Sequence, residues 1–136
     1  MAFARFLLAA CLTLLAFPSL AAEGYWQGVA KTVIEAVDRG EAAHAKGDTD
    51  SARRAVLEAY FKRFEDSKME AAIRKAISAK RAAEIERMFD AMRKAAGGSD
   101  AAALKTAAQT LRTAVAEVGK VLDDANVSPA VFEVNQ

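Results

Sequence analysis

The feature that most constrains this sequence is a regular apolar repeat between residues 104 and 122. Apolar side chains recur there at alternating spacings of four and three residues, at Leu104, Ala108, Leu111, Val115, Val118 and Leu122. This spacing places all six side chains on one face of an α-helix and is typical of the seam of a left-handed bundle or coiled coil. The segment is therefore expected to be a helix that packs against other helices.

The rest of the chain favours helices as well, because it is rich in Ala, Glu, Lys and Arg and has few Gly and Pro residues. A first helix is predicted from Tyr25 to Ala45, with its end at Gly47 and Asp50 as the N-cap of the next helix. The second helix carries a heavy apolar stripe, made of Ala52, Val56, Leu57, Tyr60, Phe61 and Phe64. This stripe is expected to face the core.

Two changes of phase divide the middle of the sequence. The stripe of the second helix cannot continue through Met69 and Ile73 in one straight helix, and Ser67 to Glu70 fits the S-x-x-E capping box. A kink or a fresh helix is therefore expected at Ser67. A second change falls near Ser78, and the helix that follows is expected to end at Gly97-Gly98, with Ser99 or Asp100 as the next cap.

These elements predict an all-α fold, an antiparallel up-and-down bundle of four to five helices, because short connections force neighbouring helices to run in opposite directions. Residues 23–136 are expected to form this single domain, with 126–136 as a loosely docked tail. The central pair of each apolar stripe should meet in one core, made of Val33, Val37, Tyr60, Phe64, Ile85, Phe89, Leu111 and Val115.

Residues 1–22 have the layout of a secretory signal peptide. A single charge, Arg5, precedes a long apolar run that ends in small residues, so cleavage is predicted after Ala21 or Ala22. Two other interpretations remain open, an uncleaved membrane anchor and a lipoprotein box at residues 8–11, which ends in Cys11. The leader predicts a periplasmic or secreted protein.

Charge and cysteine content exclude several classes of function for residues 23–136. The leader contains Arg5, one of 19 basic residues, and none of the 18 acidic ones, so the rest of the chain has 18 of each and no net charge. Basic and acidic residues are interleaved, and nucleic acid is not an expected partner. The only cysteine lies in the leader, which excludes disulfides, cysteine nucleophiles and cysteine-ligated metals from the rest of the chain. No nucleophile or phosphate-binding motif is found, and the protein is predicted not to be an enzyme.

His44 is the only histidine, and it forms a Glu-x-x-His pair with Glu41. This spacing sets a carboxylate and an imidazole side by side on a helix, so Glu41, His44 and Asp48 are candidate ligands of iron or another divalent cation. A symmetrical di-iron site would need a second histidine and is excluded. The alternative is that His44 is a cation at the end of its helix and Glu41 a solvated charge.

Glu65 and Glu70 flank the predicted helix break and are a second pair of candidate metal ligands. The alternative is that Glu70 only closes the capping box. Glu86 is expected to pair locally with a nearby Arg or Lys. Met88 and Met92 share a stripe with Ile85 and are predicted to fill the core rather than to bind copper or haem.

Residues 47–96 resemble the extracytoplasmic helical region of long bacterial members of the high-affinity iron permease family. The likeness consists of the Gly47-Asp48 start, the run from Ala59 to Glu65, the run from Met69 to Arg74, and the Ile-Glu-x-x-Phe pattern from Ile85 to Phe89. The chain lacks the Arg-Glu-x-x-Glu motifs and the membrane helices of the permeases, so it cannot transport iron by itself.

The resemblance implies a free periplasmic form of this accessory domain, with Glu65 and Glu70 in transient contact with an iron ion. The expected function is therefore a non-enzymatic bundle that binds a metal cation, iron first, and relays it to an inner-membrane iron permease or another membrane partner. A ligand-free structural or protein-interaction bundle, as a homodimer through the last helix, is the main alternative. A bundle that binds haem or another small ligand non-covalently is a third.

Overall fold

The computed structural model of the protein describes residues 24–132 and contains only helices within that range. They are α1 (Tyr25–Ala45), α2 (Thr49–Glu58), the π-helix η1 (Ala59–Glu65), α3 (Met69–Ala76), α4 (Ala79–Ala96), α5 (Ala101–Asp124) and the short 3-10 helix η2 (Pro129–Phe132). The predicted all-α fold is confirmed. The proposed signal peptide, residues 1–22, and the last residues of the predicted tail, 133–136, lie outside the described residues.

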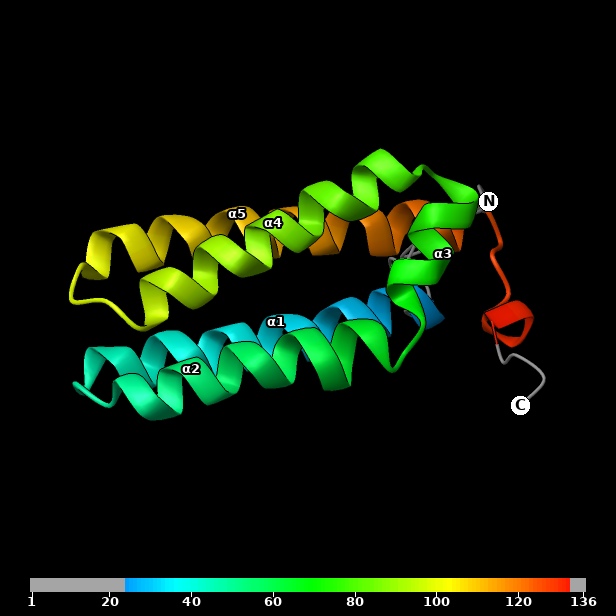
Figure 1. Ribbon diagram of the computed structural model, residues 1–136. Helices are drawn as coiled ribbons and strands as arrows, with labels where there is room; N and C mark the ends of the chain where they lie inside the picture. The colour runs from blue at the N-terminus through cyan, green and yellow to red at the C-terminus, as the bar shows by residue number, and fades with distance from the viewer. Residues whose placement is uncertain (1–23, 133–136) are drawn as a thin grey trace, which may run out of the picture.

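The four long helical segments run alternately up and down the bundle (Figure 1). One pair consists of α1 and of α2 with its continuation η1, and the other consists of α4 and α5. The short helix α3 lies at one end of the bundle and connects η1 to α4, while the α1–α2 and α4–α5 loops lie at the opposite end. No helix between residues 24 and 132 is long and apolar enough to cross a membrane.

Side-chain caps explain why three of the helices begin where they do. Asp48 accepts a hydrogen bond from Ser51 N at the start of α2, Ser78 accepts one from Arg81 N at the start of α4, and Asp100 accepts two at the start of α5. The predicted cap at Asp100 and the predicted break near Ser78 are therefore confirmed. Asp50 was the wrong cap, because α2 begins at Thr49, directly after the left-handed turn at Gly47 (φ +78°), and Asp50 already lies within its first turn.

The predicted break at Ser67 is confirmed, but the capping box is not formed. The residue before α3 is Lys68, in the left-handed conformation with φ +66°. The Ser67 hydroxyl donates to Phe64 O and accepts from Met69 N, while Glu70 binds Arg74 instead of turning back towards Ser67. The π-helix η1 leads directly into this turn.

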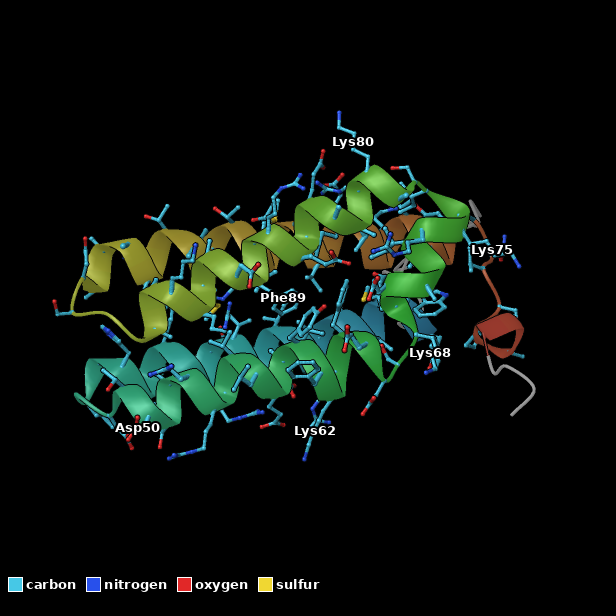
Figure 2. All side chains as sticks on the ribbon, in the orientation of Figure 1. Asp50, Lys62, Lys68, Lys75, Lys80 and Phe89 are labelled. Carbon is cyan, nitrogen blue, oxygen red and sulfur yellow. The ribbon has the colours of Figure 1, made fainter. Side chains whose placement is uncertain are left out.

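The predicted core is present and is centred on aromatic rings. Phe64 is fully buried, and its ring centroid lies 5.2 Å from that of Phe89 and 6.2 Å from that of Tyr60. Phe89 points from α4 towards the α2–η1 segment (Figure 2). The apolar repeat of α5 is buried in the same core.

Two members of the second stripe were placed wrongly by the sequence. Leu57 is 41% exposed and Phe61 is 51% exposed, although both were expected to face the core. The apolar stripe on α2 and η1 is wider than the surface that α1 and α4 cover, so its outer edge stays in solvent.

The contact between α1 and α5 is close enough to require glycine at position 119. A Cβ atom on Gly119 would lie 2.9 Å from Trp26 O and 3.0 Å from Ala30 Cβ, whereas a Cβ on Gly28 would meet no atom within 4 Å. These two glycines therefore form a matched pair, one at a helix crossing and one on an open surface.

We expect Gly119→Ala to lower the free energy of unfolding by about 1 kcal/mol, because the cost of forcing the helices apart exceeds the gain in helix propensity. Gly28→Ala should instead raise it by up to about 1 kcal/mol. Urea denaturation followed by circular dichroism measures both. Equal effects of the two substitutions would contradict the close approach of α1 and α5.

The first turn of α1 is held by the last turns of α5. The Asp123 carboxylate accepts hydrogen bonds from Trp26 N at 3.0 Å, Gln27 N at 2.9 Å and Gln27 Nε2 at 3.1 Å. A side chain at Gly24 would overlap this carboxylate. Asp123 thus acts as the N-terminal cap of α1, although it lies at the other end of the described chain.

Candidate functional site

The structure gives each residue of the predicted Glu41, His44 and Asp48 site a local partner. Glu41 forms an ion pair with Arg112 of α5. His44 Nε2 lies 2.8 Å from Gly98 O in the loop between α4 and α5, where it can donate a hydrogen bond. Asp48 caps α2, and its hydrogen bonds with Ser51 lower its pKa. Each of the three side chains is therefore engaged by a partner within the protein.

Glu70 and Glu86, in contrast, are brought together from two helices by one arginine. Arg74 Nε lies 2.7 Å from Glu70 Oε1, and Arg74 Nη2 lies 2.8 Å from Glu86 Oε1. The contact within α3 is an i,i+4 pair, while the second contact joins α3 to α4. Hydrogen bonds to Glu70, followed by the charges of both carboxylates, raise the pKa of Arg74.

The pKa of Glu86 is raised by partial burial first and then by the neighbouring Glu70 carboxylate, an effect that Arg74 offsets only in part. Two carboxylates share one guanidinium, so this junction of α3 and α4 has an excess of negative charge.

Glu65 extends the group from the side of η1. The Tyr60 hydroxyl is hydrogen-bonded to Glu65, and burial, followed by this bond and the charges of Glu65, Glu70 and Glu86, raises the pKa of Tyr60. Tyr60 therefore lies next to Glu65, and the charges of Glu70 and Glu86 also act on it. We call Glu65, Glu70, Glu86, Arg74 and Tyr60 the acidic junction. It includes both carboxylates that the sequence singled out at the helix break.

Glu86 is the member of the acidic junction that the sequence missed. A local partner was expected, but the arginine that binds it is twelve residues away on another helix. Glu84 does have the local partner, since it pairs with Arg81 at i,i−3. Only the packing of α3 on α4 brings Glu86 to Glu70, and no spacing in the sequence signals this packing.

The acidic junction is not a ready-made metal cage. Within residues 24–132, no three His, Cys, Asp or Glu side chains are grouped closely enough to hold a metal ion. The guanidinium of Arg74 holds two of the three carboxylates instead. Any cation that binds here has to compete with this arginine.

An open groove adjoins the acidic junction and shares two residues with it. The groove has a volume of about 310 Å³ and lies between α4 and the α2–η1 segment. It is lined by Val56, Leu57, Tyr60, Phe61, Glu86, Phe89, Asp90 and Arg93. We call it the aromatic groove. Its position beside a π-helix fits the frequent occurrence of π-helical turns at functional sites.

No protein-family model, curated protein or solved structure matches this chain. These comparisons therefore give no support to the resemblance of residues 47–96 to the iron permease accessory region, which remains a prediction from the sequence.

Proposed function

We propose that the protein is a non-enzymatic helical bundle that binds a metal cation at Glu65, Glu70 and Glu86, and that this cation is iron. The observation that carries the proposal is the convergence of Glu70 and Glu86 from two helices on a single guanidinium. Glu65 is linked to them through Tyr60, on whose pKa all three carboxylates act. Carboxylate oxygens are hard ligands, which suit hard cations. The resemblance of residues 47–96 to the iron permease region supports iron as the cargo.

Arg74 gives the site a mechanism of release. In the metal-free protein its guanidinium neutralises part of the junction's negative charge, and an arriving cation has to displace it. Breaking the ion pairs of Arg74 costs free energy, so the affinity for the metal is lower than it would be without the arginine. When Arg74 returns to the carboxylates, it assists release of the metal. Modest affinity suits a carrier that passes its cargo on.

The proposed route begins in the periplasm or outside the cell, where the leader would deliver the protein. The acceptor would be an inner-membrane iron permease or another membrane protein, because a soluble carrier of this kind has to deliver its ion to a transporter. Iron is then the transported ion and not a resident cofactor.

Calorimetric titration with ferrous iron, kept anaerobic, tests the proposal, with zinc and magnesium as comparison ions. Wild-type protein should bind iron at micromolar to near-millimolar concentrations. The double variant Glu65→Gln/Glu70→Gln and the single variant Glu86→Gln should each bind at least about tenfold more weakly, since each removes a charged ligand. Arg74→Gln should bind more tightly than wild type, because the competing guanidinium is gone.

Glu84→Gln is the matched control, because Glu84 lies on α4 but pairs with Arg81, outside the acidic junction. Its affinity should equal that of wild type. Loss of binding only in His44→Ala would instead move the site to Glu41, His44 and Asp48. Wild-type protein that binds none of the ions up to near-millimolar concentrations contradicts the proposal.

Affinity should also weaken as pH falls, because the carboxylates take up protons that compete with the metal. The pKa of Glu86 is raised, so Glu86 is protonated at a higher pH than an ordinary carboxylate. The loss should therefore begin above the pH at which Glu side chains normally titrate. In Glu86→Gln the remaining affinity should fall only at lower pH, and the same titrations repeated across a pH series measure both curves.

The other two expected functions are a protein-interaction bundle and a haem or small-ligand binder. A structural observation favours the protein-interaction bundle. That observation is the exposure of Leu57 and Phe61 at the edge of the aromatic groove. Haem is the weaker alternative, since His44 is engaged by Gly98 and Met92 is fully buried in the core.

A further inference from the structure

The aromatic groove has large exposed apolar side chains along one wall. Leu57 and Phe61 line it, are 41% and 51% exposed, and are four residues apart along the α2–η1 segment. The groove has a volume of about 310 Å³, with Phe89 and Tyr60 among its other lining residues. Large exposed apolar side chains beside an apolar recess are typical of a protein-interaction surface.

The charges along the groove are divided between its two ends. Glu86 lies at one end, where it shares Arg74 with Glu70, and Glu65 approaches the same end from η1. Arg93 lies at the other end, seven residues and about 10 Å further along α4.

Arg93 also lines the adjoining surface together with Arg53 and Lys94, while the nearest carboxylate at this end is that of Asp90, its ion-pair partner. The face is therefore acidic at the α3 end and basic at the α4–α5 loop end.

A surface of this kind is complementary to itself. In a two-fold contact, if residue i of one copy touches residue j of the other, then residue j of the first copy also touches residue i of the second. An antiparallel approach of two α4 helices therefore places Glu86 of each copy against Arg93 of the other. The same rotation brings the α2–η1 segments of the two copies together, so Leu57 and Phe61 of each copy pack against the groove face of the other. The protein without its leader has no net charge, so two copies do not repel each other as a whole.

We infer that the aromatic groove is the interface of a two-fold symmetric homodimer, in which Phe61 and Leu57 of each copy pack against the groove face of the other. This assigns the dimer to the α2–η1 and α4 face and not to α5, whose apolar stripe is buried within the bundle. The interface shares Glu86 and Tyr60 with the acidic junction, whereas Phe61, Leu57 and Arg93 lie outside it. Variants of Phe61 and Arg93 therefore test the dimer without changing a proposed metal ligand.

Sedimentation velocity over protein concentrations from about 1 μM to about 1 mM, the range of weak to moderate affinities, tests this inference. Wild-type protein should convert from monomer to dimer within this range. Phe61→Glu should raise the dissociation constant at least about 30-fold, as expected for a buried aromatic anchor. Val121→Glu is the matched control, since Val121 is 42% exposed but lies outside the groove, and it should leave the dissociation constant unchanged.

Charge reversal tests the orientation. Glu86→Lys and Arg93→Glu should each weaken the homodimer, because each places like charges opposite one another. An equimolar mixture of the two variants should dimerise as well as wild type, since Lys and Glu then meet at one contact and the native pair meets at the other. Phe61 and Arg93 are both exposed, so their variants test the interface even if Glu86→Lys does not fold, which circular dichroism reveals.

Three outcomes would overturn the inference. Wild-type protein that stays monomeric throughout the concentration range is the first. The second is a dimer that Val121→Glu disrupts as strongly as Phe61→Glu does, which would place the interface elsewhere. The third is a mixture of the charge-reversal variants that associates no better than either variant alone, which would exclude the antiparallel pairing.

Discussion

Replacing Phe64 by alanine is expected to lower the free energy of unfolding by about 3–5 kcal/mol, a large part of the stability of a domain of this size. Phe64 is completely buried, and its ring contacts those of Phe89 and Tyr60 where η1 meets α4. Truncation leaves a cavity that the surrounding helices close only in part. Thermal and urea denaturation followed by circular dichroism measure the loss.

Phe61→Ala is the control for this substitution, because it removes the same ring from the same π-helix at a position that is half exposed. At low protein concentration it should cost less than about 1 kcal/mol. If Phe64→Ala leaves the unfolding midpoint unchanged, the aromatic cluster is not the centre of the core.

Asp123→Ala should lower the free energy of unfolding by about 2 kcal/mol, because it removes a charged acceptor from the two backbone N–H groups that begin α1. Hydrogen exchange of the Trp26 and Gln27 amides should accelerate strongly, since both lose their acceptor. Nuclear magnetic resonance measures this exchange directly.

Asp124→Ala provides the comparison, as its carboxylate pairs with Lys120 on the exposed surface of α5. It should change stability by less than about 0.5 kcal/mol. Similar effects of the two substitutions would show that α1 does not depend on the carboxylate of α5.

The helices could be predicted from the sequence because their signals are local. Glycine and capping residues placed the ends of α1, α4 and α5 close to where they are, and the apolar repeat identified the buried face of α5. The same rules failed at Leu57 and Phe61, which are exposed. Amphipathic spacing predicts how wide the apolar face of a helix is, but it does not predict how much of that face the neighbouring helices cover.

The acidic junction could be predicted only in part. Glu65 and Glu70 stood out because they flank a helix break, but their relation to Glu86 depends on how α3 folds back on α4. The candidate ligands around His44 show the limits of spacing in another way. Their spacing is favourable, but Arg112 and Gly98 approach from distant parts of the chain and engage two of them. Spacing identifies neighbours along a helix and does not identify competitors from other helices.

The π-helix η1 also affects how this chain should be aligned with other sequences. Its hydrogen bonds join residues five apart, so it accommodates one more residue than a regular α-helix would over the same rise. A homologue in which residues 59–65 form an ordinary α-helix would need one residue fewer to join the same two ends. A single-residue gap in this segment is therefore compatible with an unchanged bundle, and an ungapped alignment across it would assign the wrong counterparts to Phe64 and Glu65.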